Sequence, residues 1–320
     1  MIRKTLEHGG NLDHHINIFG GDKSNWIDLS TGINNSPYPI PKIPKWVWMS
    51  LPDKKLIESF KTVARDFWKV PKDSDIISAN GTSSIISLLP SIFNKGNVDI
   101  YHPSYNEYEA AFLRNGWKVS NTDLRARILV NPNNPDGKYW TSKDILPNGQ
   151  ITIIDESFCD LTPDRSLIRF SNQPGVIILK SFGKFWGLAG LRLGCAIASP
   201  ETLQNLRSAL GPWPASGPAL FIARAALENK RWAENNIKNL DHHATKFDNI
   251  LVKNDIEIIG GTSLFKLIKT PNAEKLKTHF AKNHVLIRTF SYSNKIARIG
   301  IPNSNHCRFQ IKTILSEFKQ

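Results

Sequence analysis

The stretch Val176–Ala196 reads VIILKSFGKFWGLAGLRLGCA. It begins with an apolar, strand-forming run and continues as a glycine-rich loop that carries Lys184 between Ser181 and Arg192. Glycines let a backbone approach a ligand closely, and a lysine amine can form a Schiff base with a carbonyl cofactor. A serine hydroxyl and an arginine guanidinium beside that amine could hold an anion. Taken alone, the same pattern also fits a strand followed by a surface loop with solvated cations.

Other short apolar runs end in polar or glycine-rich residues in the same way. They are Ile76–Ser78 before Asn80–Ser84, Val98–Tyr101 before His102–Tyr105, Ile128–Val130 before Asn131–Gly137, and Ile151–Ile154 before Asp155 and Glu156. Helix-like segments separate most of these runs, which predicts an α/β fold with a largely parallel sheet. Ligands bind such sheets at the carboxyl ends of the strands, where all of these polar clusters fall.

The remaining segments indicate a second, smaller domain. Amphipathic spacing predicts a helix from about Trp46 to Trp68, and a long helical stretch covers roughly Ala219–Leu251. Beyond it, short strands at 256–259, 264–269, 285–288 and 297–301 alternate with helices near 273–282 and 307–318. Residues 1–45 are polar and turn-rich and are expected to form an arm. We predict a large α/β domain over 46–215 and a smaller α+β domain formed by 1–45 and 216–320.

The composition is that of an ordinary globular protein, with 320 residues, 40% hydrophobic and 22% charged. The widely spaced Cys159, Cys195 and Cys307 argue for a reducing compartment and against a disulfide framework or a zinc site. The histidine pairs at 14–15 and 242–243 lack the spacing of a helical metal site, so no metal is predicted. With neither an apolar leader nor a run long enough to span a membrane, the chain is expected to be cytoplasmic.

The formal net charge of +13 does not by itself indicate nucleic-acid binding. The cations are scattered and form no dense tract, and no helix-turn-helix or RNA-binding signature is present. Anionic small ligands or a lysine-rich host proteome explain the charge better than a nucleic-acid or membrane partner.

Two of the polar clusters suit a cofactor that carries both a phosphate and a protonated ring nitrogen. Gly81, Thr82 and Ser83 precede a predicted helix, whose N-terminus favours a phosphate, although an ordinary helix cap explains the same residues. Asp155 follows a buried strand, where a carboxylate is costly unless a group such as a protonated ring nitrogen pairs with it.

The other clusters complete a site for an aromatic ring. Asn134 could donate to a ring oxygen and Tyr105 could stack on the ring, with turn chemistry and core packing as the alternatives. Together with Lys184, these residues indicate pyridoxal phosphate, whose ring serves as an electron sink. The phosphate-binding GxxxxGK[ST] motif is absent, and no GxGxxG follows a strand.

With these motifs in this order, the chain resembles the fold-type I superfamily of pyridoxal-phosphate-dependent aminotransferases over essentially its whole length. The motifs are HGGN at 8–11, DLSTGIN at 28–34, NPNNPDG at 131–137, DESF at 155–158, SFGK at 181–184, GLAGLRLG at 187–194 and PWPAS at 212–216. They are most similar to the threonine-phosphate decarboxylase family of cobalamin biosynthesis, whose nearest aminotransferase relatives act on histidinol phosphate. The resemblance implies decarboxylation of L-threonine O-3-phosphate to (R)-1-amino-2-propanol phosphate. An aminotransferase acting on histidinol phosphate or a related phosphorylated amino acid is the alternative.

The same resemblance implies a role for each cofactor residue. It makes Lys184 the lysine that forms the Schiff base and moves the proton, and it pairs Asp155 with the ring nitrogen. It assigns Asn134 to the ring hydroxyl and Tyr105 to the ring face. The residues expected around the cofactor phosphate are Gly81, Thr82, Ser83, Ser181 and Arg192.

For the substrate, Arg298 matches the arginine that binds the α-carboxylate. Arg288 resembles the arginine that receives the substrate's phosphate, together with His8, Gly32 and Asn34. The loop Gly211–Pro218 is similar to one that reaches the neighbouring subunit's cofactor, which implies a homodimer.

Some positions depart from the aminotransferase pattern. Phe158 stands where aminotransferases usually carry a tyrosine that bonds the ring hydroxyl, a replacement shared with the decarboxylase branch. Leu51 replaces a tyrosine that usually contacts phosphate across the subunits, and the connection between Gly116 and Ile128 is short. The choice between decarboxylation and transamination depends on which substrate bond stands perpendicular to the ring, so here it rests on the resemblance. A non-catalytic protein with this fold is a further alternative.

Overall fold

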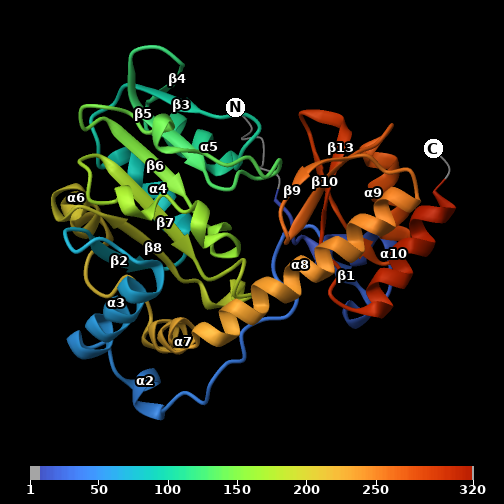
Figure 1. Ribbon diagram of the computed structural model, residues 1–320, viewed down its shortest axis with the longest axis horizontal. Coiled ribbons are helices and arrows are strands. Elements are labelled where there is room, and N and C mark those ends of the chain that lie inside the picture. The colour runs from blue at the N-terminus through green and yellow to red at the C-terminus, as the bar shows by residue number, and fades with distance from the viewer. Residues whose placement is uncertain (1–7, 319–320) are drawn as a thin grey trace. The chain divides into compact units, whose positions relative to one another are not determined.

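The computed structural model describes residues 8–318, which form two compact units (Figure 1). Unit 2 comprises Pro37–Asn134 and Lys138–Glu234, and the other described residues form unit 1. The division into functional domains at 46 and 215 stays a prediction.

A seven-stranded sheet forms the centre of unit 2, with the strand order β2-β8-β7-β6-β5-β3-β4. Its strands are β2 (Asp75–Ala79), β3 (Asn97–Ile100), β4 (Lys118–Val119), β5 (Leu124–Val130), β6 (Ile151–Asp155), β7 (Val176–Ser181) and β8 (Gly194–Ala198). Strands β3 to β7 are mutually parallel, whereas β8 pairs antiparallel with both β2 and β7. This arrangement confirms the predicted α/β fold with a mostly parallel sheet.

Strand β8 is the main element that the sequence pattern does not predict. Its residues, GCAIA, are small and follow directly on the glycine-rich loop, so they give only a weak strand signal. The strand is fully buried and lies between β2 and β7. Since it alone runs antiparallel, its amino end lies at the sheet edge where β2 and β7 have their carboxyl ends.

The helices of unit 2 are α2 (Lys45–Met49), α3 (Lys54–Trp68), α4 (Thr82–Leu88), α5 (Asn106–Arg114), α6 (Pro200–Leu210) and α7 (Gly217–Glu228). The prediction of one helix over 46–68 is wrong, because α2 and α3 are separate. Pro52 lies in the break and Asp53 caps α3, accepting a hydrogen bond from the backbone of Leu56 at 2.7 Å.

The helical stretch expected over 219–251 is also divided in two. Helix α8 (Lys230–Lys253) begins after a break at Asn229, whose side-chain oxygen accepts from the backbone of Trp232 at 3.0 Å. Helix α7, which the predicted division assigns to the smaller domain, lies in unit 2 and packs against α3. Its small Ala219, Ala223 and Ala226 are buried, which suits close helix packing.

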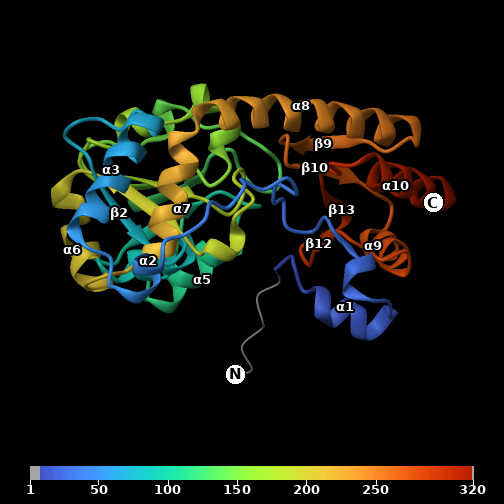
Figure 2. The ribbon, with the colours of Figure 1, turned by 90° about the horizontal axis from the view of Figure 1, so that it is seen from below.

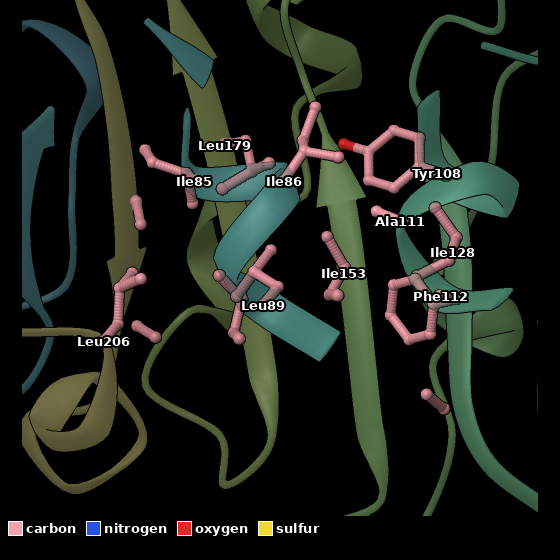
Figure 3. Close-up of a cluster of buried hydrophobic side chains, with 14 of the residues drawn as sticks. Ile85, Ile86, Leu89, Tyr108, Ala111, Phe112, Ile128, Ile153, Leu179 and Leu206 are labelled. Atoms are coloured by element: carbon pink, nitrogen blue, oxygen red, sulfur yellow. The ribbon is translucent and has the colours of Figure 1, made fainter. Parts of the chain in front are cut away.

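The core under α4 and α5 holds the sheet and these helices together (Figure 3). Ile85 from α4, Leu89 in the turn directly after α4 and Phe112 from α5 are almost fully buried, as are Ile153 and Leu179 on the strands beneath. Burying a side chain of this size stabilises a fold by about 1.5–3 kcal/mol. This core therefore holds the carboxyl ends of β6 and β7 in place relative to the helices that cover the sheet.

Unit 1 contains an antiparallel sheet with the order β12-β13-β10-β9 and a parallel pair of β1 with β11. Its strands are β1 (Ile27–Asp28), β9 (Ile258–Gly261), β10 (Phe265–Lys269), β11 (Val285–Leu286), β12 (Arg288–Phe290) and β13 (Ser293–Gly300). Helices α9 (Ala273–Lys282) and α10 (Asn305–Glu317) and most of α8 belong to it. Figure 2 shows α1 (Leu12–Phe19) next to α9.

Within residues 8–318, no helix combines the length and apolar character needed to cross a membrane.

Candidate active site

The predicted cofactor residues of unit 2 gather at one edge of its sheet. Asp155 and Ser181 are the last residues of β6 and β7, and Gly81 follows the end of β2. Tyr105 and Asn134 come a few residues after β3 and β5. Because β8 is antiparallel, Arg192, just before its amino end, reaches the same edge. The arrangement matches the usual ligand position in parallel α/β sheets.

A tight cradle forms where β2, β8 and α4 meet. Gly81 has a φ of 81°, and a Cβ there would stand 2.6 Å from Nη2 of Arg192. A Cβ at Gly194 would stand 2.4 Å from the backbone nitrogen of Thr82. Arg192 itself has a φ of 51°, a left-handed conformation that is uncommon for residues other than glycine. Only glycines allow the guanidinium and the first amides of α4 to come this close together.

Asp155 is 4% exposed and is held by neutral donors. Its Oδ1 accepts from the backbone and the hydroxyl of Ser157 at 2.9 and 2.6 Å, and its Oδ2 accepts from the Tyr108 hydroxyl at 2.8 Å. Burial raises the pKa of Asp155, and these hydrogen bonds together with the charge of Lys184 oppose that rise. The carboxylate is therefore oriented, and a nearby positive charge would stabilise its ionised form further.

Tyr108 and Ser157 are site residues that the sequence analysis missed. The turn chemistry of Asp155 could have indicated Ser157, since aspartates often bond the backbone two residues on. Tyr108 is fully buried on α5 and looks like a core aromatic in sequence. Burial, followed by the charge of Asp155, raises the pKa of Tyr108 well above its usual range, so this hydroxyl stays protonated and donates.

Two loops that carry the predicted ring contacts are tied together by Asn133. Its Oδ1 accepts from the Ser104 hydroxyl at 2.9 Å, and its Nδ2 donates to the carbonyl of Pro103 at 2.9 Å. These bonds join the loop with Tyr105 to the loop with Asn134. The Tyr105 hydroxyl shares a hydrogen bond with the Ser83 side chain, and burial raises the pKa of Tyr105.

Lys184 lies in the turn after β7. Its ammonium nitrogen is 5.5 Å from the centre of the buried Phe158 ring. The hydroxyl of Ser181 accepts from the backbone of Gly183 at 3.1 Å, which shapes this turn. The side chain of Phe158 has no hydroxyl, so this position cannot donate a hydrogen bond to an oxygen on the cofactor ring.

Unit 1 brings two predicted substrate arginines together. Arg288 on β12 and Arg298 on β13 are direct cross-strand partners. Arg298 is buried, donates to the carbonyl of Ser30 and lies over the Phe265 ring. Burial, and then the charge of Arg288, lower the pKa of Arg298 to about 10. Like charges directly opposite each other are destabilising, so this pair favours an anion.

The other predicted substrate residues also belong to unit 1. Asn34 is buried, with its Oδ1 accepting from the backbone of Ser36 at 2.9 Å and its Nδ2 donating to Asn236 at 3.2 Å. Gly32 has a φ of 63°, and His8 is exposed. Asn236 was not foreseen, because it lies inside a long amphipathic helix.

Residues 47–311 match the family model described as aminotransferase class I and II. The chain belongs to this family. It is 34% identical to a threonine-phosphate decarboxylase of Sinorhizobium sp over 92% of this chain and 93% of the relative. A protein of the same name from Pseudomonas aeruginosa is 30% identical over 98% of both chains. A histidinol-phosphate aminotransferase of Ruminiclostridium cellulolyticum is 23% identical over 81% of this chain and 83% of the relative.

Solved structures show the same fold. A histidinol-phosphate aminotransferase from Sinorhizobium meliloti, in complex with pyridoxal-5'-phosphate, has a TM-score of 0.83 and 15% identity, covering 98% of this chain and 95% of its own. An L-threonine-O-3-phosphate decarboxylase from Porphyromonas gingivalis has a TM-score of 0.71 and 18% identity, covering 90% and 98%.

The site of this family member suits pyridoxal phosphate, which is its cofactor. The cradle of Gly81 and Arg192 offers backbone amides and a guanidinium to a phosphate. The donors that bond Asp155 are uncharged hydroxyls and a backbone amide, so they do not neutralise its negative charge. That charge is therefore suited to pair with a protonated ring nitrogen. Among residues 8–318, no cluster of three or more His, Cys, Asp or Glu side chains could hold a metal ion.

Proposed function

We propose that this enzyme decarboxylates L-threonine O-3-phosphate to (R)-1-amino-2-propanol phosphate, a step of cobalamin biosynthesis. The observation that carries the proposal is the 34% identity over 92% of the chain to a relative named threonine-phosphate decarboxylase. The cross-strand arginines of unit 1 support it, because this substrate bears both a carboxylate and a phosphate.

Bound pyridoxal phosphate supplies an electron-accepting ring for the electron pair released when the bond between Cα and the carboxylate breaks. The residues of the chain prepare that step. Lys184 would bind the cofactor covalently and afterwards deliver a proton to Cα, in place of the departed CO₂. Asp155 would keep the ring nitrogen protonated, while Asn134 would bond the ring hydroxyl and Tyr105 would stack on the ring. Gly81, Thr82, Ser83, Ser181 and Arg192 would hold the phosphate.

Substrate orientation decides which bond breaks. In this proposal Arg298 binds the α-carboxylate, and Arg288 binds the substrate phosphate together with His8, Gly32 and Asn34. Holding both anions would place the bond to the carboxylate perpendicular to the ring. Phe158 supports this reading, since the hydroxyl that aminotransferases usually place there is missing.

The test is to supply the purified holoenzyme with L-threonine O-3-phosphate, without any 2-oxo acid, and to measure CO₂. We expect sustained release, and Lys184→Ala should reduce it by at least about 10²–10⁴-fold, the usual contribution of proton transfer alone. Product that forms only when 2-oxoglutarate is added would overturn the decarboxylase and support an aminotransferase. The histidinol-phosphate aminotransferases among the relatives make histidinol phosphate the substrate to test in that event.

We further propose that the enzyme is a homodimer. Large apolar side chains 50–82% exposed gather on α2 and two nearby loops, namely Trp46, Trp48, Met49, Leu51 and Trp213. Gly217 approaches the carbonyl of Val47 so closely that a Cβ would stand 2.8 Å away, which joins α2 to the end of the 211–218 loop. Several large exposed apolar side chains on neighbouring segments are typical of an interface.

Light scattering should give twice the chain mass of 36.1 kDa at micromolar concentration. Trp48→Glu should shift this mass toward that of one chain, because a buried charge opposes association. A dilution-independent mass of one chain for the unaltered enzyme would disprove the dimer. A cytoplasmic location stays a prediction.

A further inference from the structure

A buried ionic cluster lies beside the cofactor residues and takes no part in the contacts proposed above. Lys180 is 2% exposed, and its ammonium nitrogen lies 2.8 Å from Oε2 of Glu156 and 3.4 Å from Oδ1 of Asp160. We refer to these three residues as the Lys180 cluster. Burial disfavours the charged form of Lys180, but the two carboxylates outweigh burial and raise its pKa. Lys180 therefore stays protonated and cannot compete with Lys184 as a nucleophile.

The Glu156 carboxylate connects three separate segments of the chain. Its Oε1 accepts from the backbone of Leu167 at 2.6 Å and from Nδ2 of Asn131 at 3.3 Å. Its Oε2 accepts from the hydroxyl of Ser166 at 2.5 Å, in addition to the Lys180 ammonium. The end of β5, the end of β6 and the loop at 166–167 are thus joined to β7 through one side chain.

Asp160 extends the cluster to two tryptophans. Its Oδ1 accepts from the indole nitrogen of Trp68 at 3.1 Å, and its Oδ2 accepts from that of Trp186 at 2.9 Å. Trp186 is fully buried and comes two residues after Lys184. The turn that carries Lys184 is therefore anchored to the same cluster as the strand ends.

Two members of the cluster are adjacent in sequence to a predicted cofactor contact, and the third, Asp160, bonds Trp186 near Lys184. Lys180 precedes Ser181 on β7, and Glu156 follows Asp155 at the end of β6. Neighbouring residues of a strand point to opposite faces, so the cluster holds these strand ends from the side away from the cofactor contacts. Charge-assisted hydrogen bonds are directional, which makes such a cluster suited to fixing positions.

We infer that Lys180 is a positioning residue, which holds the ends of β6 and β7 and the Lys184 turn in the geometry that binds pyridoxal phosphate. A buried ion pair is often no more stabilising than apolar side chains of the same size, so stability alone does not account for it. The inference rests on the cofactor contacts proposed for Asp155, Ser181 and Lys184. It does not depend on which substrate the enzyme uses.

The test measures cofactor binding without substrate. Apoprotein of Lys180→Met and Lys180→Arg would be titrated with pyridoxal phosphate, following the visible absorbance and the tryptophan fluorescence. We expect Lys180→Met to raise the dissociation constant at least about tenfold and to shift the visible band, because small displacements of a preorganised site are costly. Lys180→Arg keeps the charge and should restore most of the affinity.

Arg127→Met is the matched control, because Arg127 forms an ion pair with Asp99 at 2.8 Å between β5 and β3 of the same sheet. It should lower the melting temperature of the apoprotein and leave the dissociation constant within about twofold of the unaltered protein, since it supports no cofactor contact. An equal loss of affinity in Arg127→Met and Lys180→Met would mean that lost stability, rather than position, explains both.

If Lys180→Met does not fold, the double variant Glu156→Gln with Lys180→Met removes one charge of each sign and leaves the net charge of the cluster unchanged. A folded Lys180→Met or double variant that binds the cofactor with unaltered affinity and spectrum would overturn the inference. Failure of the proposed decarboxylation would be recognised separately, as holoenzyme with a normal spectrum that releases no CO₂.

Discussion

The two sets of predicted site residues are held in place by different means. At the sheet edge of unit 2, Asp155 is oriented by neutral hydroxyls and a backbone amide, and all of these groups are buried. In unit 1, Arg288 and Arg298 face each other as like charges across β12 and β13. A hydrogen-bonded network binds one ligand shape closely, whereas a pair of like charges favours any suitably placed anion.

The two regions would contribute differently to the specificity of the reaction. The unit 2 network is suited to the cofactor, which all members of such a family share. In the proposed function, the arginine pair would determine which anions of the substrate are held, and hence which of its bonds is oriented for cleavage. Variants in the two regions should therefore fail in different ways.

Among the variants that compare the two regions, the largest effect is expected at Arg298. Arg298→Ala should lower kcat/KM for L-threonine O-3-phosphate by about 10- to 100-fold, the range for losing a hydrogen bond between charged groups. The loss should appear with L-threonine as well, because both molecules carry the α-carboxylate. The visible spectrum of the holoenzyme should remain unchanged, since Arg298 is not among the cofactor contacts.

Arg288→Ala is the comparison that sharpens this prediction. If Arg288 binds the phosphate, its loss should lower kcat/KM for L-threonine O-3-phosphate and have little effect on the binding of L-threonine, which carries no phosphate. Steady-state kinetics with both compounds distinguish the two arginines. Equal losses for Arg288→Ala on both compounds would contradict the assignment of the phosphate to Arg288.

Much of the fold could be predicted because its signals are local. The apolar runs at 76–78, 98–101, 128–130, 151–154 and 176–179 all lie in strands, except that Tyr101 follows the end of β3, and polar or glycine-rich residues follow each run. Asp155 and Ser181 consequently share one edge of the sheet, whereas Arg192 reaches it through β8, which the pattern does not predict. The break at Pro52 was missed, since the hydrophobic spacing continues across it even though the backbone does not.

The supporting residues could not be predicted because their contacts are distant in sequence. Tyr108 bonds Asp155 across 47 positions, and Trp68 bonds Asp160 across 92. Both tyrosine and tryptophan at these positions look like core residues, and only the packing of α5 and α3 places their polar atoms. Lys180 is similar, because a lysine next to a glycine-rich loop is expected to be solvated.

A smaller effect is expected at Tyr108, in the unit 2 network. Tyr108→Phe removes one hydrogen bond to the Asp155 carboxylate and should lower kcat/KM at pH 7 by about tenfold, as for other bonds to a charged group. Burial already raises the pKa of Asp155, and the Tyr108 hydroxyl opposes that rise. Removing the hydroxyl should therefore raise this pKa further, so that Asp155 becomes protonated at a higher pH. Since the ionised form is needed beside the ring nitrogen, the acidic limb of the pH–rate profile should move to higher pH.

Tyr139→Phe is the matched control for Tyr108→Phe, because the exposed Tyr139 hydroxyl shares a hydrogen bond with the Thr162 hydroxyl at 3.1 Å, whereas the Tyr108 hydroxyl donates to Asp155. Its profile should superimpose on that of the unaltered enzyme. A Tyr108→Phe profile with an unmoved acidic limb would show that Ser157 and the charge of Lys184 keep Asp155 ionised without the Tyr108 hydroxyl. The hydrogen bonds around Asp155 would then keep it ionised even without Tyr108. The unit 2 site would in that case depend less on each single side chain than the arginine pair of unit 1 does.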